Sequence, residues 1–137
     1  MSSITLSKLV QVPLRDVWKH EAQHFTQWLA RPENLEYLNE AIGLDLANVQ
    51  TEVGVGQFFV DILAEDEGGE SSRRIIVENQ LEPTNHDHLG KIITYAAGLQ
   101  AGVVVWIVEK ARQEHEQAIN WLNEHTDADT NFFLIQV

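Results

Sequence analysis

The sequence predicts a single α/β domain in which a mixed β-sheet is flanked by helices. Its length of 137 residues suits one domain with a core of its own. Three strand patterns joined by turns fill residues 45–80, which indicates antiparallel hairpins. After residue 80, helical and strand patterns alternate, as they do where helices connect parallel strands. Hairpins followed by alternating elements together predict a mixed sheet covered on both faces.

Two helices are expected before the strands, over about Pro13–Ala30 and Pro32–Ile42. Apolar residues recur every three or four positions along the first segment, which is the spacing of one helix face. A proline suits the first turn of the second helix, and Gly43 suits its C-terminal stop.

The first two strands are predicted within residues 45–66, with Gly54 and Gly56 at the turn between them. The polar run EDEGGESS follows and predicts the tip of a second hairpin. RRIIVENQ then provides the third strand, so the three strands should pair in sequence order.

The second half alternates between helices and strands. A helix begins after LEPTNHDH and ends between Gly98 and Gly102, and RQEHEQAINWLNEH is an amphipathic helix. VVVWIV is a continuous apolar run, typical of a strand buried on both faces. Trp106 and Trp121 are both expected in the core. The final NFFLIQV indicates either a piece of a longer chain or an edge strand completing the sheet.

The composition limits the chemistry. The absence of cysteine excludes disulfides, thiolate zinc sites and cysteine nucleophiles, and is compatible with a cytoplasmic protein. The N-terminus lacks a basic start followed by an apolar run, and no apolar stretch approaches the roughly 20 residues of a membrane span. A net charge of −12 argues against nucleic-acid binding when taken alone, but net charge does not describe a single cleft.

The string His20-Glu21-Ala22-Gln23-His24 is a literal H-E-x-x-H, the signature of zinc proteases. At about 100° per residue, Glu21 falls inside the apolar stripe formed by Trp18 and Phe25, and His20 points to nearly the opposite side. A zinc protease needs both histidines to converge on one metal. The two histidines are therefore better explained as a solvated face, and Glu21 as an acid that is paired or metal-bound, or that reaches the rim.

Two further acids lie inside apolar strands, where acids are uncommon. Asp61 follows Phe58-Phe59-Val60, and Glu78 follows Ile75-Ile76-Val77. If the two strands form a hairpin, the carboxylates approach each other and repel unless a cation lies between them. Oxygen ligands of this type suit Mg²⁺ or Mn²⁺, which activate water and polarise phosphodiesters. The alternative places each acid on a solvated strand face near its end.

In this order, Glu21, Asp61 and Glu78-Asn79-Gln80 resemble the motif of the PD-(D/E)XK nuclease superfamily, in particular an uncharacterised bacterial group with an ExQ variant. The restriction-endonuclease-like core of that superfamily, α-β-β-β-α-β, matches the predicted order over nearly the whole chain. The resemblance implies that Asp61, Glu78 and the backbone carbonyl of Asn79 hold Mg²⁺ or Mn²⁺, that Glu21 is an additional acid, and that DNA is the substrate.

One departure from the motif bears on activity. Gln80 occupies the position of the usual lysine, and an amide orients water or phosphate only by hydrogen bonds. On the following helix, His88, Lys91 and Tyr95 are spaced to lie on one side. Lys91 is our candidate for the missing cation, with His88 and Tyr95 contacting phosphate. The alternative is that Tyr95 is core, His88 caps or solvates the helix start, and Lys91 extends to solvent.

The sequence thus favours a divalent-metal-dependent deoxyribonuclease. A catalytically inactive nuclease-fold module that binds nucleic acid or protein is the alternative, which the acidic composition favours. A zinc metallopeptidase using His20, Glu21 and His24 ranks third. The fold is also compatible with a homodimer.

Overall fold

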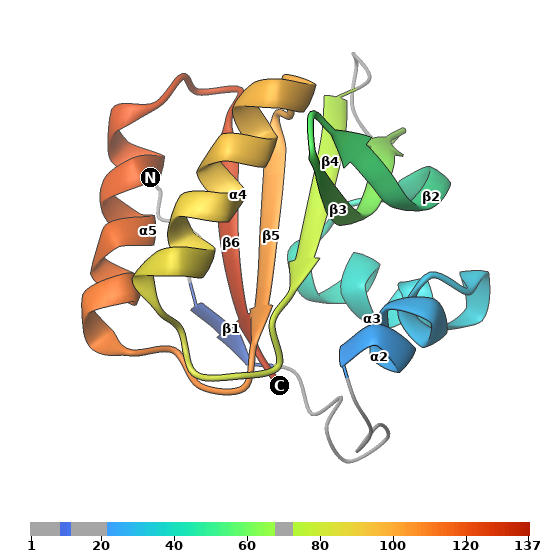
Figure 1. Ribbon diagram of the computed structural model, residues 1–137, viewed down its shortest axis with the longest axis horizontal. Helices are drawn as coiled ribbons and strands as arrows, with labels where there is room; N and C mark the ends of the chain where they lie inside the picture. Colours follow the sequence, from blue (N-terminus) through green and yellow to red (C-terminus); the bar gives the residue numbers. More distant parts are fainter. Residues whose placement is uncertain (1–8, 12–21, 68–72) are drawn as a thin grey trace.

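The computed structural model describes residues 9–11, 22–67 and 73–137, and within them six strands form one mixed sheet (Figure 1). Their order across the sheet is β1-β6-β5-β4-β3-β2. The strands are β1 (Leu9–Gln11), β2 (Leu46–Val55), β3 (Phe58–Asp66), β4 (Arg73–Asn79), β5 (Val103–Val108) and β6 (Asn131–Gln136). The described helices are α2 (Ala22–Leu29), α3 (Pro32–Ile42), α4 (His86–Leu99) and α5 (Gln113–His125).

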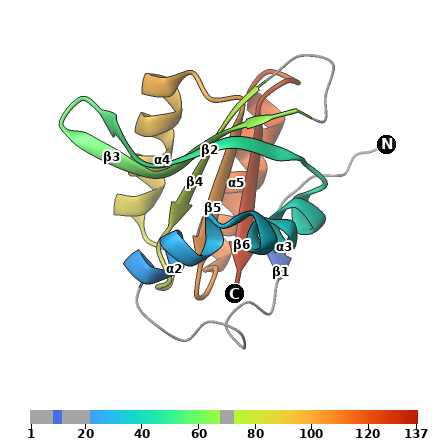
Figure 2. The same cartoon turned by 90° about the vertical axis from the view of Figure 1, so that its right-hand side faces the viewer.

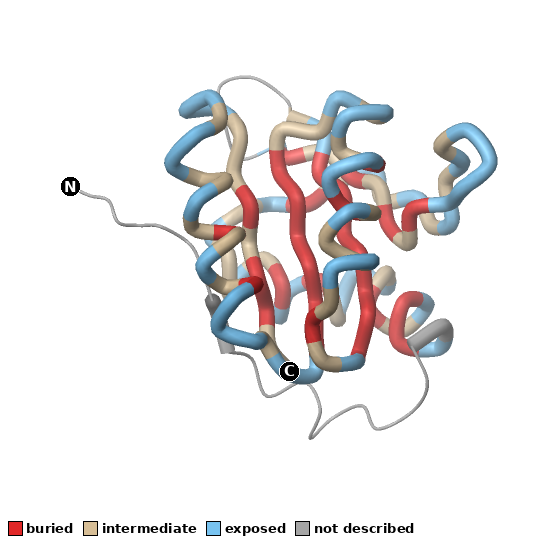
Figure 3. Tube along the Cα trace, turned by 60° about the vertical axis from the view of Figure 1, so that its left-hand side comes forward, coloured by how far each residue is buried: buried red, intermediate tan, exposed pale blue. Residues whose placement is uncertain are grey.

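Helices cover both faces of the sheet, which confirms the predicted fold class. Figures 1 and 2 show α4 and α5 on one face, with α2 and α3 on the other. Each face of the sheet packs against its helices in a separate hydrophobic cluster. Successive residues of a strand contribute to opposite clusters, because their side chains point to opposite faces. Ile76 and Trp106 pack toward α4 and α5, whereas Ile75 and Val105 pack in the other cluster. Figure 3 shows the central strands as the buried layer beneath helices with exposed outer sides.

The sheet has an antiparallel half and a parallel half. β2, β3 and β4 pair antiparallel in sequence order, and β4, β5, β6 and β1 pair in parallel. Every residue of β5 is buried, as its apolar run predicted. The predicted elements from Pro32 onward all occur. α3 has the predicted bounds and ends at Gly43, whose φ is 69°.

Two expectations about the sheet and core are corrected, and one strand was not predicted. The last strand, β6, is not an edge strand, because β1 pairs with it in parallel. The sequence analysis did not predict β1. Trp106 is fully buried as expected, but Trp121 is 57% exposed and stacks on His125. Trp121 lies about 200° around α5 from the buried Ile119, which places it on the solvent side.

Two predictions fall partly outside the described residues. The predicted first helix began near Pro13, and the structure describes it only from Ala22. Most of the EDEGGESS tip, residues 68–72, is also not described. No helix in the described part of the chain is long and apolar enough to cross a membrane.

The β2–β3 hairpin leaves the plane of the sheet and approaches α4 (Figure 2). β2 is irregular where Asn48 and Glu52 have positive φ, and irregularities of this kind bend a strand. The tight turn is made by Gly56, with φ of 60°, while the other predicted turn glycine, Gly54, lies inside β2. At Gly98 of α4, an added Cβ would come within 2.7 Å of Val55, so hairpin and helix are in close contact.

Candidate active site

The pairing of β3 with β4 opens at two carboxylates. Regular pairing ends at Ile62 and Val77. Beyond them, the Asp61 backbone N–H donates to Glu78 Oε2 at 2.7 Å, and the Asn79 backbone N–H donates to Asp61 Oδ2 at 2.8 Å. Side chains thus replace the ladder hydrogen bonds, and each carboxylate is held by the opposite strand. The predicted approach of Asp61 and Glu78 is present in the structure.

The two carboxylates are poorly solvated and carry like charges. Glu78 is 7% exposed and Asp61 is half-buried. Burial and then the charge of Asp61 raise the pKa of Glu78 to about 8. Burial also raises the pKa of Asp61, although its hydrogen bonds from Asn79 and Glu78 oppose the shift. A proton or a cation is therefore needed to stabilise the pair at neutral pH.

The donor set fits a hard divalent cation. Carboxylate oxygens are the ligands that Mg²⁺ and Mn²⁺ prefer, and one oxygen of each group is already oriented by a backbone N–H. Within the described ranges, no three His, Cys, Asp or Glu side chains converge to hold a metal. The Asn79 backbone carbonyl is a candidate for a further protein ligand, and Glu21, which lies outside those ranges, is another.

A third acid near the pair was missed by the sequence analysis. Glu52 lies on β2 between the residues that pair with Ile62 and Val60, so it is opposite Asp61. Its negative charge is one of the causes that raise the pKa of Asp61. Its side chain is exposed. The signal was present in the sequence as an acid in the middle of a strand, but its alignment with Asp61 depends on the register of the β2–β3 hairpin.

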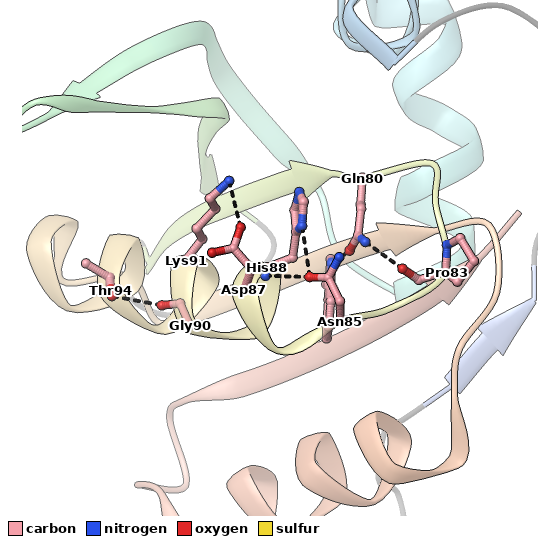
Figure 4. Close-up of polar contacts among 9 residues, drawn as sticks. Gln80, Pro83, Asn85, Asp87, His88, Gly90, Lys91 and Thr94 are labelled. Atoms are coloured by element: carbon pink, nitrogen blue, oxygen red, sulfur yellow. Dashed lines mark hydrogen bonds and ion pairs between the residues drawn. The ribbon is translucent and has the colours of Figure 1, made fainter.

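Helix α4 brings the three predicted helix residues to the acid pair. Its N-cap, Asn85, accepts from the His88 backbone N–H at 2.8 Å (Figure 4). The charge of Lys91 lowers the pKa of Glu78, and that of His88 lowers the pKa of Asp61. Tyr95 is 5% exposed, and burial followed by the charge of Glu78 raises its pKa.

Lys91 and His88 are themselves constrained. Lys91 Nζ lies 3.3 Å from Asp87 Oδ2, one turn earlier on α4 (Figure 4). His88 Nδ1 lies 3.1 Å from Asn85 Oδ1, and burial lowers the pKa of His88. A phosphate at this site would therefore have to attract Lys91 away from Asp87.

Gln80 does not present a free amide to the acid pair. Trp106 Nε1 donates to Gln80 Oε1 at 2.9 Å, and Gln80 Nε2 donates to the Pro83 carbonyl at 2.6 Å. The side chain is 3% exposed, and Figure 4 shows it directed toward the loop before α4. These two bonds use one N–H and one lone pair of the amide, which leaves one donor and one acceptor position for any further contact.

The remaining sequence candidates lie elsewhere. The Asn79 side chain donates to Thr26 on α2, so only the backbone of Asn79 faces the acid pair. His24 is exposed on α2. His20 and Glu21 lie outside the described residues, so the zinc-site hypothesis and the additional-acid hypothesis both stay predictions.

A second polar cluster, which the sequence analysis missed, joins the start of α4 to the start of α5. His86 Nδ1 and His115 Nε2 are 2.8 Å apart, and His115 Nδ1 is 2.8 Å from Thr84 Oγ1. Thr84 is fully buried, and its hydroxyl accepts from the Arg112 backbone N–H at 2.9 Å. These residues line a cavity of about 370 Å³. The sequence signal was weak: His115 shares a helix face with the buried Ile119.

A scan of protein-family models and a search of curated proteins found no match to the chain. A search of solved structures found a similarity to the crystal structure of a repair endonuclease from Pyrococcus abyssi, with a TM-score of 0.60 and 11% sequence identity. The similarity covers 87% of this chain and 48% of the other, so the chain spans about half the length of that protein. The mixed sheet flanked by helices is therefore a fold that this chain shares with part of that endonuclease.

Proposed function

We propose that the chain is a divalent-metal-dependent phosphodiester hydrolase that acts on DNA, a deoxyribonuclease of the PD-(D/E)XK type. The observation that carries the proposal is the Asp61–Glu78 pair, which is poorly solvated and held by reciprocal backbone hydrogen bonds. The fold similarity to a repair endonuclease supports it. Perturbed carboxylates in such a position are typical of functional sites.

The residues at the site have separate tasks in this proposal. Asp61, Glu78 and the Asn79 carbonyl would hold Mg²⁺ or Mn²⁺, which when bound lowers the pKa of a water and polarises the phosphodiester. Lys91 exchanges its contact with Asp87 for a phosphate oxygen and so provides the positive charge that Gln80 lacks. His88 and the Tyr95 hydroxyl donate hydrogen bonds to phosphate, and Glu21 is an additional acid.

The test is cleavage of plasmid and oligonucleotide DNA in Mg²⁺ or Mn²⁺ by wild type and Asp61→Asn. The substitution should abolish cleavage, because it removes one of the two anionic ligands. Glu65→Gln is the matched control, since Glu65 lies on the same strand and its contact with Asn48 survives as an amide. Cleavage that persists in Asp61→Asn would exclude the proposal.

A binding module without catalytic activity is the second candidate. The observation that favours it is that the position expected to hold a lysine carries Gln80, a neutral side chain already bonded to Trp106 and Pro83. This candidate requires oligonucleotide or protein binding with no cleavage in any divalent metal. Light scattering on the same samples would reveal a homodimer. Their metal content would reveal bound zinc, and zinc that is lost in His24→Ala would favour the peptidase.

A further inference from the structure

The β2–β3 hairpin carries two neighbouring exposed phenylalanines just after its turn. Phe58 is 55% exposed and Phe59 is 64% exposed. The two rings lie on opposite faces of the hairpin, because successive strand side chains alternate. Phe59 pairs across the hairpin with Gly54 and lies 4.0 Å from where a Cβ would stand there, an arrangement that shields a strand glycine. Phe58 instead faces α4.

Phe58 forms one wall of a cavity of about 400 Å³ against α4. Its ring centroid is 6.2 Å from that of Tyr95, with the planes tilted by 38°. The opposite wall is polar and includes Asp87, Lys91 and Thr94. The cavity therefore combines an aromatic face with a group of hydrogen-bonding side chains.

The polar wall has both donors and acceptors to offer a ligand. The Thr94 hydroxyl donates to the Gly90 carbonyl at 2.8 Å, so its oxygen still has lone pairs that accept (Figure 4). The ion pair of Lys91 with Asp87 is exposed and adds charged donors and acceptors. The site therefore suits a flat ligand whose edge carries several hydrogen-bonding groups.

Two residues that line the cavity lie within electrostatic range of the acid pair. Lys91 and Tyr95 both line the cavity. The charge of Lys91 lowers the pKa of Glu78, and burial, followed by the charge of Glu78, raises the pKa of Tyr95. Phe58 precedes Asp61 by three residues on β3, a rise of about 10 Å along a strand. The close contact between Gly98 and Val55 fixes the hairpin on α4, so the two walls are held in position before any ligand binds.

We propose that this cavity receives an unpaired base of single-stranded DNA, stacked on Phe58, with the adjoining phosphodiester at Asp61 and Glu78. The inference rests on the proposed function and names the form of its substrate. A base offers a π-face to Phe58 and a hydrogen-bonding edge to the polar wall. Within a duplex, neighbouring base pairs cover both faces of a base, so Phe58 stacks only on a base that has left the helix.

The experiment measures binding separately from cleavage. Fluorescence anisotropy is recorded for a labelled single strand and for the same strand annealed to its complement. Ca²⁺ replaces Mg²⁺, and a gel verifies that the DNA stays intact. The variants are Phe58→Leu, which keeps apolar bulk but removes the ring, Phe58→Tyr, which keeps the ring, and Phe59→Leu as the matched control on the other face. All four proteins are also melted to verify folding.

The single strand should bind at least 10-fold more tightly than the duplex. Phe58→Leu should weaken single-strand binding by roughly 10-fold, while Phe58→Tyr and Phe59→Leu stay within about 2-fold of wild type. Equal binding of duplex, no binding of either DNA, or equal effects at Phe58 and Phe59 would overturn the inference. If DNA is cleaved but Phe58 has no influence, hydrolysis stands and the inference falls. If single-strand binding depends on Phe58 but no DNA is cleaved, the inference stands and hydrolysis falls.

Discussion

Two polar clusters lie near the two ends of the loop that joins β4 to α4. They differ in whether their polar groups are satisfied by partners within the chain. In the acid pair, Asp61 and Glu78 are like-charged, and the pKa of each is raised. In the histidine cluster, Thr84, His115 and His86 form a chain of hydrogen bonds that needs no charged group. Each cluster contains buried polar side chains, Glu78 in one and Thr84 and His115 in the other, so burial alone does not separate them.

Hydrogen-bond accounting shows that the histidine cluster is complete. The Thr84 hydroxyl accepts from the Arg112 backbone N–H, so it can donate to His115 Nδ1. His115 then carries its proton on Nε2 and donates to His86 Nδ1. Burial, and next the proximity of His86, lowers the pKa of His115, which keeps the ring neutral. The buried groups, Thr84 and His115, satisfy each other's hydrogen bonds and those of His86 Nδ1 and the Arg112 N–H without any ligand.

The difference separates a scaffold from a site. A polar cluster that is satisfied within the chain fixes the loop and needs nothing more. A buried pair of like charges is destabilised by repulsion and by the loss of solvation, and a proton or a cation relieves both. Such destabilised groups are concentrated at binding and catalytic sites. The two clusters should therefore respond in opposite ways to substitution.

The largest effect is expected at Glu78. Glu78→Gln keeps an oxygen for the Asp61 N–H but removes one anionic ligand. Cleavage should fall by more than the roughly 10–100-fold that the loss of an outer-shell partner costs. In metal-free buffer at pH 8 the same variant should melt higher, by roughly 4–10 °C, because the repulsion is gone. Calorimetry and cleavage assays measure the two effects, and a variant that melts lower would contradict this reading of the pair.

The next effect is the pH dependence of stability without metal. Between pH 4.5 and about 8, folded Glu78 keeps a proton that the unfolded chain has released. The native state then binds more protons, so this group makes the free energy of unfolding fall as pH rises, by an amount on the order of a few kcal/mol. The free energy of unfolding is measured in urea at several pH values for wild type and Glu78→Gln. The difference between the two proteins separates the pH dependence due to Glu78 from that due to the histidines. Saturating Mg²⁺ should flatten it, and a difference that rises with pH would be incompatible with the raised pKa.

A smaller effect is expected in the histidine cluster. Thr84→Val keeps the shape of the side chain but leaves His115 Nδ1 and the Arg112 N–H without their partner. The free energy of unfolding should fall by about 1–3 kcal/mol. Mg²⁺ affinity, measured by titration calorimetry, should stay at the wild-type value. A loss of metal binding larger than the loss of stability would show that the two clusters are not independent.

The smallest effect is expected from freeing Lys91. Asp87→Asn removes the carboxylate that holds Lys91 Nζ at 3.3 Å, and this exposed pair contributes only about 0–1 kcal/mol to stability. DNA affinity should rise by a few-fold, because the cation no longer has to leave an anion. Lys91→Ala should lower both affinity and cleavage, and Asp87→Asn in that background should add nothing more. Anisotropy titrations at low salt measure the change, and a gain that persists without Lys91 would refute the explanation.

Local patterns predicted the elements well. The bounds of α3 follow from a proline and a glycine at its ends, and β5 follows from its apolar run. Asp61 and Glu78 were also identified from local pattern, because two acids in apolar strands joined by a turn can approach each other if the strands form a hairpin, and the register of β3 with β4 brings them together. These features depend on neighbours in sequence or on one hairpin.

What the sequence did not predict depends on distant partners. Gln80 could be aligned with a lysine position, but the Trp106 indole that occupies its oxygen lies on another strand. The pairing of β1 with β6 likewise joins the two ends of the described chain. Trp121 shows a different limit: it was expected in the core because it is aromatic, although its position about 200° around α5 from the buried Ile119 puts it on the solvent side, where it stacks on His125.

The place of β1 has a consequence for the order in which the protein is made. β1 leaves the ribosome before the other described elements, yet its only described strand partner, β6, is synthesised after all of them. Closing a contact of such high sequence separation is slow, and its entropy cost falls after the local hairpins and helices have formed. During translation, β2 to β5 can assemble before β1 has a strand to pair with. The parallel side of the sheet is therefore completed only after β6 has emerged.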